Sequence, residues 1–138
     1  MSERLLTPEE VNRLIPRLTE LMESAMERHR QAQALQERLR EDRARVAASG
    51  RERLDSPDWK ARAERLDGLG IEVRHLLQEI LALGGVTKDL ETGLVDFPGR
   101  GPAGRGDRIV NLCWKFGEEA VEFWHGMNEG YAQRKPLA

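Results

Sequence analysis

The sequence predicts an α+β protein in which a long antiparallel helical hairpin, resembling a coiled coil, precedes a small antiparallel β-sheet. Two patterns predict this fold. Residues 7–83 repeat apolar side chains at helical spacing, whereas the residues after Gly85 alternate apolar and polar side chains. The length of 138 residues fits one domain, residues 1–138. Within it we expect a hairpin at 7–83, a β-meander at 86–126 and a tail at 127–138.

The first helix is predicted to begin at Thr7 and Pro8. Thr7 can cap the helix, Pro8 takes a position that needs no N–H, and Glu10 completes a capping box. Apolar residues then recur at the spacing of a coiled-coil seam. These are Val11, Leu14, Leu18, Leu21, Ala25, Ala32, Leu35, Leu39 and Val46, and Arg28, Asp42 and Ser49 interrupt one row. Pro16 lies inside the pattern and predicts a kink or a division of the helix.

A second helix is predicted between Ser56 and Gly84. Ser56 and Pro57 repeat the cap and first-turn signals, while Gly50 and Gly84 are suited to end the two helices. Because the linker between them is short, we expect the helices to be antiparallel neighbours. Two helices cannot enclose all of the apolar surface, so a third layer is required: either the sheet or another subunit.

Three strands are expected after the helices. A short strand at residues 94–97 should end at Pro98, and residues 109–116 should form the strongest strand. Alternation places Val110, Leu112, Trp114 and Phe116 on one face of that strand, with Asn111, Cys113 and Lys115 on the other. Residues 120–125 alternate again, although a helix at 118–125 is a competing prediction. Residues 99–106 are expected to form a loop, and the tail after Tyr131 is expected to be loosely held.

The candidate site is a polar cluster of Asp96, Cys113, Glu118 and His125. Carboxylate, thiolate and imidazole groups are competent ligands for zinc or iron. Their spacing in the sequence matches no standard metal site, and a cysteine between apolar neighbours commonly behaves as a small apolar residue. We therefore expect a hydrogen-bond network without a cofactor, and zinc or iron binding is the alternative.

The loop before the strongest strand carries a glycine motif. Residues 99–104 match G-x-G-x-x-G, but a dinucleotide site requires a helix directly after the motif, and here a strand is predicted. A hairpin loop is therefore the better interpretation. Arg100, Arg105 and Arg108 form a weak candidate for anion binding.

The bulk properties argue against several partners. The net charge of −2 provides no global attraction for nucleic acid, and the mildly basic stretch at 28–65 is interpreted as a solvated helix face. No apolar run approaches the roughly 18–20 residues of a membrane span, and the first residues lack a secretory signal. Cys113 is the only cysteine, so no intrachain disulfide is possible. We expect a cytoplasmic protein.

The C-terminal segments resemble a known family. They are Lys88-Asp89, residues 93–98, Leu112-Cys113-Trp114, Gly117-Glu118, Trp124-His125 and Arg134-Lys135-Pro136-Leu137. In this order they are similar to an uncharacterised prokaryotic family, the domain of unknown function numbered 2203, over nearly the full chain. The resemblance implies a helix-rich first half and no particular activity. Where that family often has proline, this chain has Glu119, which favours the helix alternative nearby.

Our leading functional prediction is a non-enzymatic interaction protein. Its heptad pattern predicts self-association through the helical hairpin, as a homodimer or a larger assembly. The alternative is a small-molecule or metal-binding protein, or an enzyme, whose site lies on the C-terminal sheet.

Overall fold

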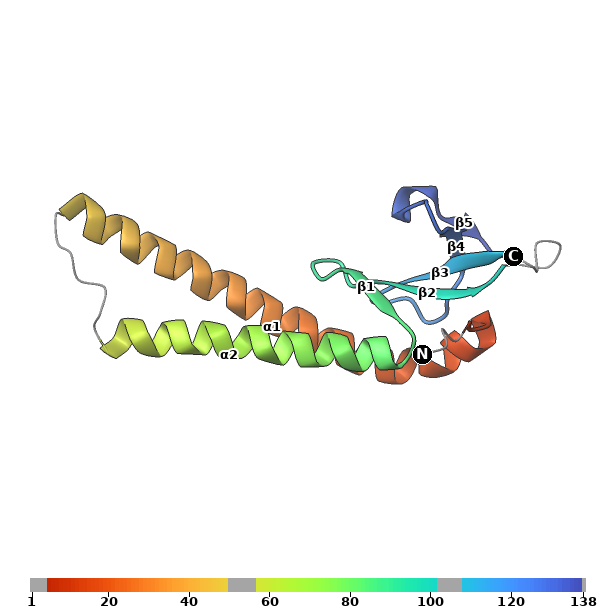
Figure 1. Ribbon diagram of the computed structural model, residues 1–138, viewed down its shortest axis with the longest axis horizontal. Coiled ribbons are helices and arrows are strands. Elements are labelled where there is room, and N and C mark those ends of the chain that lie inside the picture. Colours follow the sequence, from red (N-terminus) through yellow and green to blue (C-terminus); the bar gives the residue numbers. More distant parts are fainter. Residues whose placement is uncertain (1–4, 50–56, 102–107, 138) are drawn as a thin grey trace.

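The computed structural model describes residues 5–49, 57–101 and 108–137. They form two helices followed by one five-stranded sheet, in agreement with the predicted α+β class (Figure 1). The elements are α1 (Pro8–Ser49), α2 (Pro57–Ala82), β1 (Val86–Asp89), β2 (Leu94–Arg100), β3 (Ile109–Lys115), β4 (Phe123–Gly126), the 3₁₀-helix η1 (Tyr131–Gln133) and β5 (Lys135–Pro136). The sheet lies against one end of the hairpin, and the other end extends beyond it as an arm (Figure 1).

The capping box at the start of α1 is confirmed. The backbone N–H of Glu10 donates to Thr7 Oγ1 at 3.2 Å, and the N–H of Thr7 donates to Glu10 Oε1 at 3.0 Å. Pro16 lies inside one continuous helix, so the predicted division near it is wrong. The first turns nevertheless run at an angle to the rest of α1, as an interior proline is expected to cause (Figure 1).

The second helix also follows its sequence signals. It begins at Pro57 and ends at Ala82, and Gly84 then adopts a φ of 106°, a conformation that glycine reaches without steric cost. The predicted cap at Ser56 and the predicted stop at Gly50 lie outside the described residues. The two helices pack against each other, and they diverge towards the far end of the arm (Figure 1).

Polar pairs between the helices account for two of the interruptions in the heptad pattern. Arg28 Nε donates to Glu72 Oε1 at 3.0 Å, and Arg62 Nη1 donates to Asp42 Oδ2 at 2.7 Å. Each charge that breaks the apolar row of α1 therefore has a partner of opposite charge on α2. These pairs also fix the alignment of the two helices.

The sheet is an antiparallel meander of order β1-β2-β3-β4-β5. Contrary to prediction, Pro98 does not end its strand, because β2 continues to Arg100. The pairing between β1 and β2 stops at Asp96, so no backbone N–H is required at Pro98 to bond to β1. The backbone of Leu6 takes up that edge by accepting from Arg100 at 3.3 Å and donating to Pro98 O at 3.2 Å.

The structure of the C-terminal segment also differs from the prediction. Instead of a loosely held tail, residues 135–136 form β5 and pair with β4. The N–H of Leu137 donates to Glu122 O at 2.8 Å, which continues the attachment. The competing helix at 118–125 is not formed: this stretch is irregular until β4 begins at Phe123. The sheet neighbours of β4 on both sides override the local helix propensity of the glutamates.

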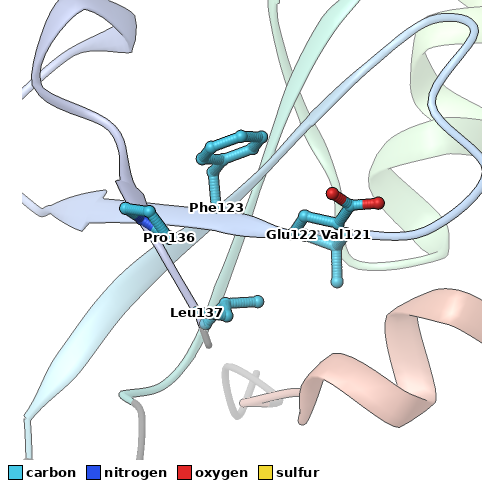
Figure 2. A pocket seen from close by; sticks show the side chains of 5 residues that line it. All are labelled: Val121, Glu122, Phe123, Pro136 and Leu137. Atoms are coloured by element: carbon cyan, nitrogen blue, oxygen red, sulfur yellow. The ribbon is translucent and has the colours of Figure 1, made fainter.

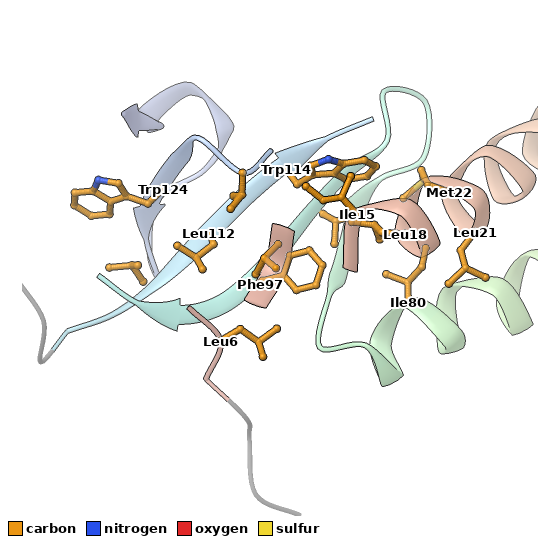
Figure 3. Packing of buried hydrophobic residues seen from close by; sticks show 14 of the residues in the cluster. Leu6, Ile15, Leu18, Leu21, Met22, Ile80, Phe97, Leu112, Trp114 and Trp124 are labelled. Carbon is orange, nitrogen blue, oxygen red and sulfur yellow. The ribbon is translucent and has the colours of Figure 1, made fainter. Parts of the chain in front are cut away.

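One face of the sheet forms the core with the helices (Figure 3). As predicted, Leu112 and Trp114 share this face, and the register places Trp124 beside Leu112. The helices contribute Leu18, Met22 and Ile80, and all three are buried. The sheet is therefore the required third layer at this end of the hairpin, but it does not extend along the arm (Figure 1).

Candidate functional site

The face of the sheet opposite the core carries three of the predicted site residues. Asp96 on β2 is paired with Cys113 on β3, and Cys113 is paired with Phe123 on β4, two residues before His125. Because side chains alternate along a strand, the side chains of these residues lie on one face. Asp96, Cys113 and His125 are only 4%, 1% and 2% exposed, so this second face is covered and not solvated.

The imidazole of His125 makes two hydrogen bonds that define its orientation. Nδ1 lies 2.9 Å from the backbone carbonyl oxygen of Gly126, and Nε2 lies 3.1 Å from Asp96 Oδ1. A carbonyl oxygen can only accept, so Nδ1 carries a proton. The contact between Nε2 and the Asp96 carboxylate gives each of these two buried side chains a polar partner.

The thiol of Cys113 completes this group. One ligand atom each from Asp96, Cys113 and His125 lies within 4.8 Å of the others. Burial raises the pKa of the thiol to about 11, the charge of Asp96 adds to this effect, and the guanidinium of Arg134 opposes it. Without a further cation, Cys113 is therefore a protonated thiol and not a nucleophilic thiolate.

Arg134 covers the cluster from the C-terminal segment. Its Nη1 lies 3.9 Å from Cys113 Sγ, and its guanidinium carbon lies 3.9 Å from the centroid of the Phe123 ring. Arg134 Nη2 donates to Glu118 Oε2 at 2.8 Å, while Glu118 Oε1 accepts from the N–H of Lys115 at 2.7 Å. The described contacts of Glu118 thus hold Arg134 in place. Arg134 in turn contacts Cys113, which lies beside the Asp96–His125 pair.

Arg134 is the residue that sequence reasoning missed. It falls in the segment expected to be a loose tail, so nothing in its local pattern placed it over the sheet. The available signal was the resemblance of the 134–137 segment to the family pattern. The predicted anion site stays a prediction: Arg100 and Arg108 are both exposed near the base of the β2–β3 loop. Arg105 lies outside the described residues.

A second candidate site lies on the arm, between the two helices. This arm groove has a volume of about 400 Å³ and is lined by Gln36, Leu39, Arg40, Arg43, Trp59, Ala63, Leu66 and Asp67. Its floor is apolar, and its charged residues are exposed at the rim. The basic rim residues, Arg40 and Arg43, come from α1, while the acidic one, Asp67, comes from α2.

Another hollow of about 390 Å³ lies between β4 and the C-terminal segment. Val121, Glu122, Phe123, Pro136 and Leu137 line it (Figure 2). Glu122 is its one ionisable lining residue, so polar groups do not converge there as they do in a site that orients a ligand. The buried cluster and the arm groove are the stronger candidates.

The fold and the buried cluster define a class of α+β proteins with a helical hairpin and a covered carboxylate–thiol–imidazole group on a meander sheet. The chain belongs to the family DUF2203, described as an uncharacterized conserved protein, whose model matches residues 4–137. Comparison with curated proteins finds no match, and neither does comparison with solved structures. In the described part of the chain, neither helix combines the length and apolar composition needed to cross a membrane.

Proposed function

We propose that this protein is a non-enzymatic interaction protein that forms a homodimer through its helical arm. The observation that carries the proposal is the arm groove, with its apolar floor, a basic rim on α1 and an acidic rim on α2. The free thiol of Cys113 fits a reducing compartment, so we place the protein in the cytoplasm as part of this proposal.

The arm has apolar surface that its own two helices do not enclose. Leu39 and Leu69 are buried there, whereas Leu35, Trp59 and Leu66 remain partly exposed. At the other end of the hairpin the sheet covers the corresponding positions. Burying partly exposed leucine and tryptophan side chains on the arm would contribute about 25 cal/mol for each Å² removed from water.

The charges at the rim favour a second copy as the partner. If two arms meet groove to groove about a two-fold axis parallel to the arm, α1 of each copy lies over α2 of the other. The basic α1 rim of one copy then lies over α2 of its partner, which carries the acidic rim, and the same arrangement occurs twice. A two-fold axis across the arm would instead place α1 on α1 and bring like charges together. The parallel arrangement is therefore the one we propose.

Charge reversal tests this arrangement directly. The full chain should be a dimer by analytical ultracentrifugation at micromolar concentration. Arg43→Glu and Asp67→Lys should each shift it towards monomer, because each weakens the attraction between the facing rims. An equimolar mixture of the two variants should dimerise again, since the two changed residues then carry opposite charges on facing rims.

Arg74→Glu is the matched control, because Arg74 is an exposed arginine of α2 outside the groove. It should leave the dimer unchanged. Circular dichroism should show that all variants keep their helix content. A wild-type chain that sediments as a monomer, or a mixture of the two variants that fails to restore the dimer, would refute the proposal.

A further inference from the structure

We propose that Asp96, Cys113 and His125 form a binding site for a divalent cation of the zinc class. The three residues supply oxygen, sulfur and nitrogen, which are the donor atoms that zinc accepts in proteins. They come from β2, β3 and β4, and their ligand atoms lie within 4.8 Å of one another. This proposal is independent of the arm groove and would survive the failure of the dimer.

The orientation of His125 is the observation that points to a metal. Its Nδ1–H donates to the carbonyl oxygen of Gly126 at 2.9 Å, while Nε2 lies against the carboxylate of Asp96. Metal-bound histidines commonly donate their second ring nitrogen to a backbone carbonyl or a carboxylate, because this fixes the tautomer and the ring plane. His125 already has this arrangement.

The distances require little movement of the side chains. A tetrahedral zinc ion with ordinary bond lengths separates a nitrogen and an oxygen ligand by about 3.3 Å and a nitrogen and a sulfur ligand by about 3.5 Å. Nε2 of His125 and Oδ1 of Asp96 are 3.1 Å apart, and the thiol lies within 4.8 Å of one ligand atom of each residue. Small rotations of Cys113 and His125 would suffice.

The donor set also suits a buried divalent ion by its charge. A carboxylate from Asp96, a thiolate from Cys113 and a neutral imidazole from His125 around a charge of +2 are neutral together. Arg134 is balanced by Glu118. The occupied site therefore carries no net charge in its buried position.

Three protein ligands leave one position of a tetrahedral ion for water or a small ligand. The ligands stand on neighbouring strands of one sheet, which holds their backbones rigidly. Arg134 covers the cluster from the C-terminal segment, which is attached to the sheet by β5, by polar contacts and by the packing of Leu137 against the core. Entry of the ion thus requires movement of a short segment and not unfolding of the sheet.

Titration of the full chain tests the site. The protein is purified, treated with a chelator and titrated first with Zn²⁺ and then, in a separate sample, with Co²⁺. We expect one zinc ion per chain. Co²⁺ should produce the near-ultraviolet band of a cysteine thiolate bound to cobalt. Absence of this band in the wild-type protein would overturn the proposal, whatever the variants do.

Two conservative variants locate the ligands. Cys113→Ser and Asp96→Asn change size very little, and each should weaken zinc binding by at least about 100-fold, more than loss of an outer partner does. His75→Gln is the matched control, because His75 is exposed on α2. Zinc binding that persists in both ligand variants would identify an adventitious surface ion and refute the site. Arg43→Glu, which disrupts the proposed dimer, should leave zinc binding unchanged.

Discussion

The side chains of Asp96 and His125 meet 3.1 Å apart although their strands, β2 and β4, are not neighbours in the sheet. The strand between them, β3, contributes Cys113 at the point where the two side chains approach. The hydrogen bond therefore links β2 to β4 across β3. Both residues are almost fully buried, so neither side chain can bond to solvent water. Their contact with each other takes the place of those lost hydrogen bonds.

Removing His125 should destabilise the metal-free protein strongly. His125→Ala leaves the carboxylate of Asp96 buried without its partner, a change that typically costs about 3–5 kcal/mol. The measurement is the free energy of unfolding in urea. His75→Ala removes an exposed imidazole and should change the same quantity by no more than about 0.5 kcal/mol. Equal effects of the two substitutions would show that the Asp96–His125 contact does not stabilise the fold.

The core between the hairpin and the sheet should be sensitive to cavities. Leu18 is fully buried in the cluster that joins α1 to the sheet. Leu18→Ala should lower the free energy of unfolding by about 2–5 kcal/mol, through lost apolar contacts and the cavity left behind. Leu81, 58% exposed on α2, is the matched control, and Leu81→Ala should have a small effect. A similar loss at both positions would contradict the burial of Leu18 between α1 and the sheet.

Much of the fold follows from local sequence signals. The capping box of Thr7 and Glu10 locates the start of α1, and the alternation around Trp114 correctly assigns the two faces of β3. These features depend on residues close together in the chain, so a pattern can reveal them. The placement of Cys113 opposite Trp114 also follows from that alternation.

The errors arise where distant partners decide the structure. Pro98 stays within β2 because Leu6, far away in the sequence, pairs with that edge. The C-terminal residues form β5 because β4 offers an open edge, which no local pattern indicates. For the same reason the position of Arg134 over Cys113 could not be predicted. Glu118 was expected beside Asp96 and His125, but its side chain contacts Arg134.

Arg134 should protect the thiol of Cys113. Arg134→Gln removes the ion pair with Glu118 and the cover over the sulfur, so we expect a loss of about 1–3 kcal/mol in stability. The thiol of the metal-free variant should also react faster with a thiol-specific reagent under native conditions. Lys135→Gln removes a nearby half-buried cation that contacts Glu129 and the Trp124 ring and not Cys113, and it should leave the labelling rate unchanged. Unaltered labelling of Arg134→Gln would show that other residues shield the sulfur.

The pair of Asp42 and Arg62 tests what the interruptions in the heptad pattern contribute. Both side chains are partly buried between α1 and α2, and Arg62 also contacts Asp58 on its own helix. Replacing a paired charge couple by apolar residues is often neutral or stabilising, whereas removing one partner leaves the other unpaired. Asp42→Leu with Arg62→Leu extends the apolar seam and should hold or raise the melting temperature. Asp42→Asn alone should cost about 1 kcal/mol, since the pair is partly screened by solvent.

The double variant should also lose the fixed alignment of the helices, which would appear as a broader distribution of distances between spin labels at the end of the arm. If the double variant melts well below the single one, the charged pair stabilises the hairpin itself and does more than set its register.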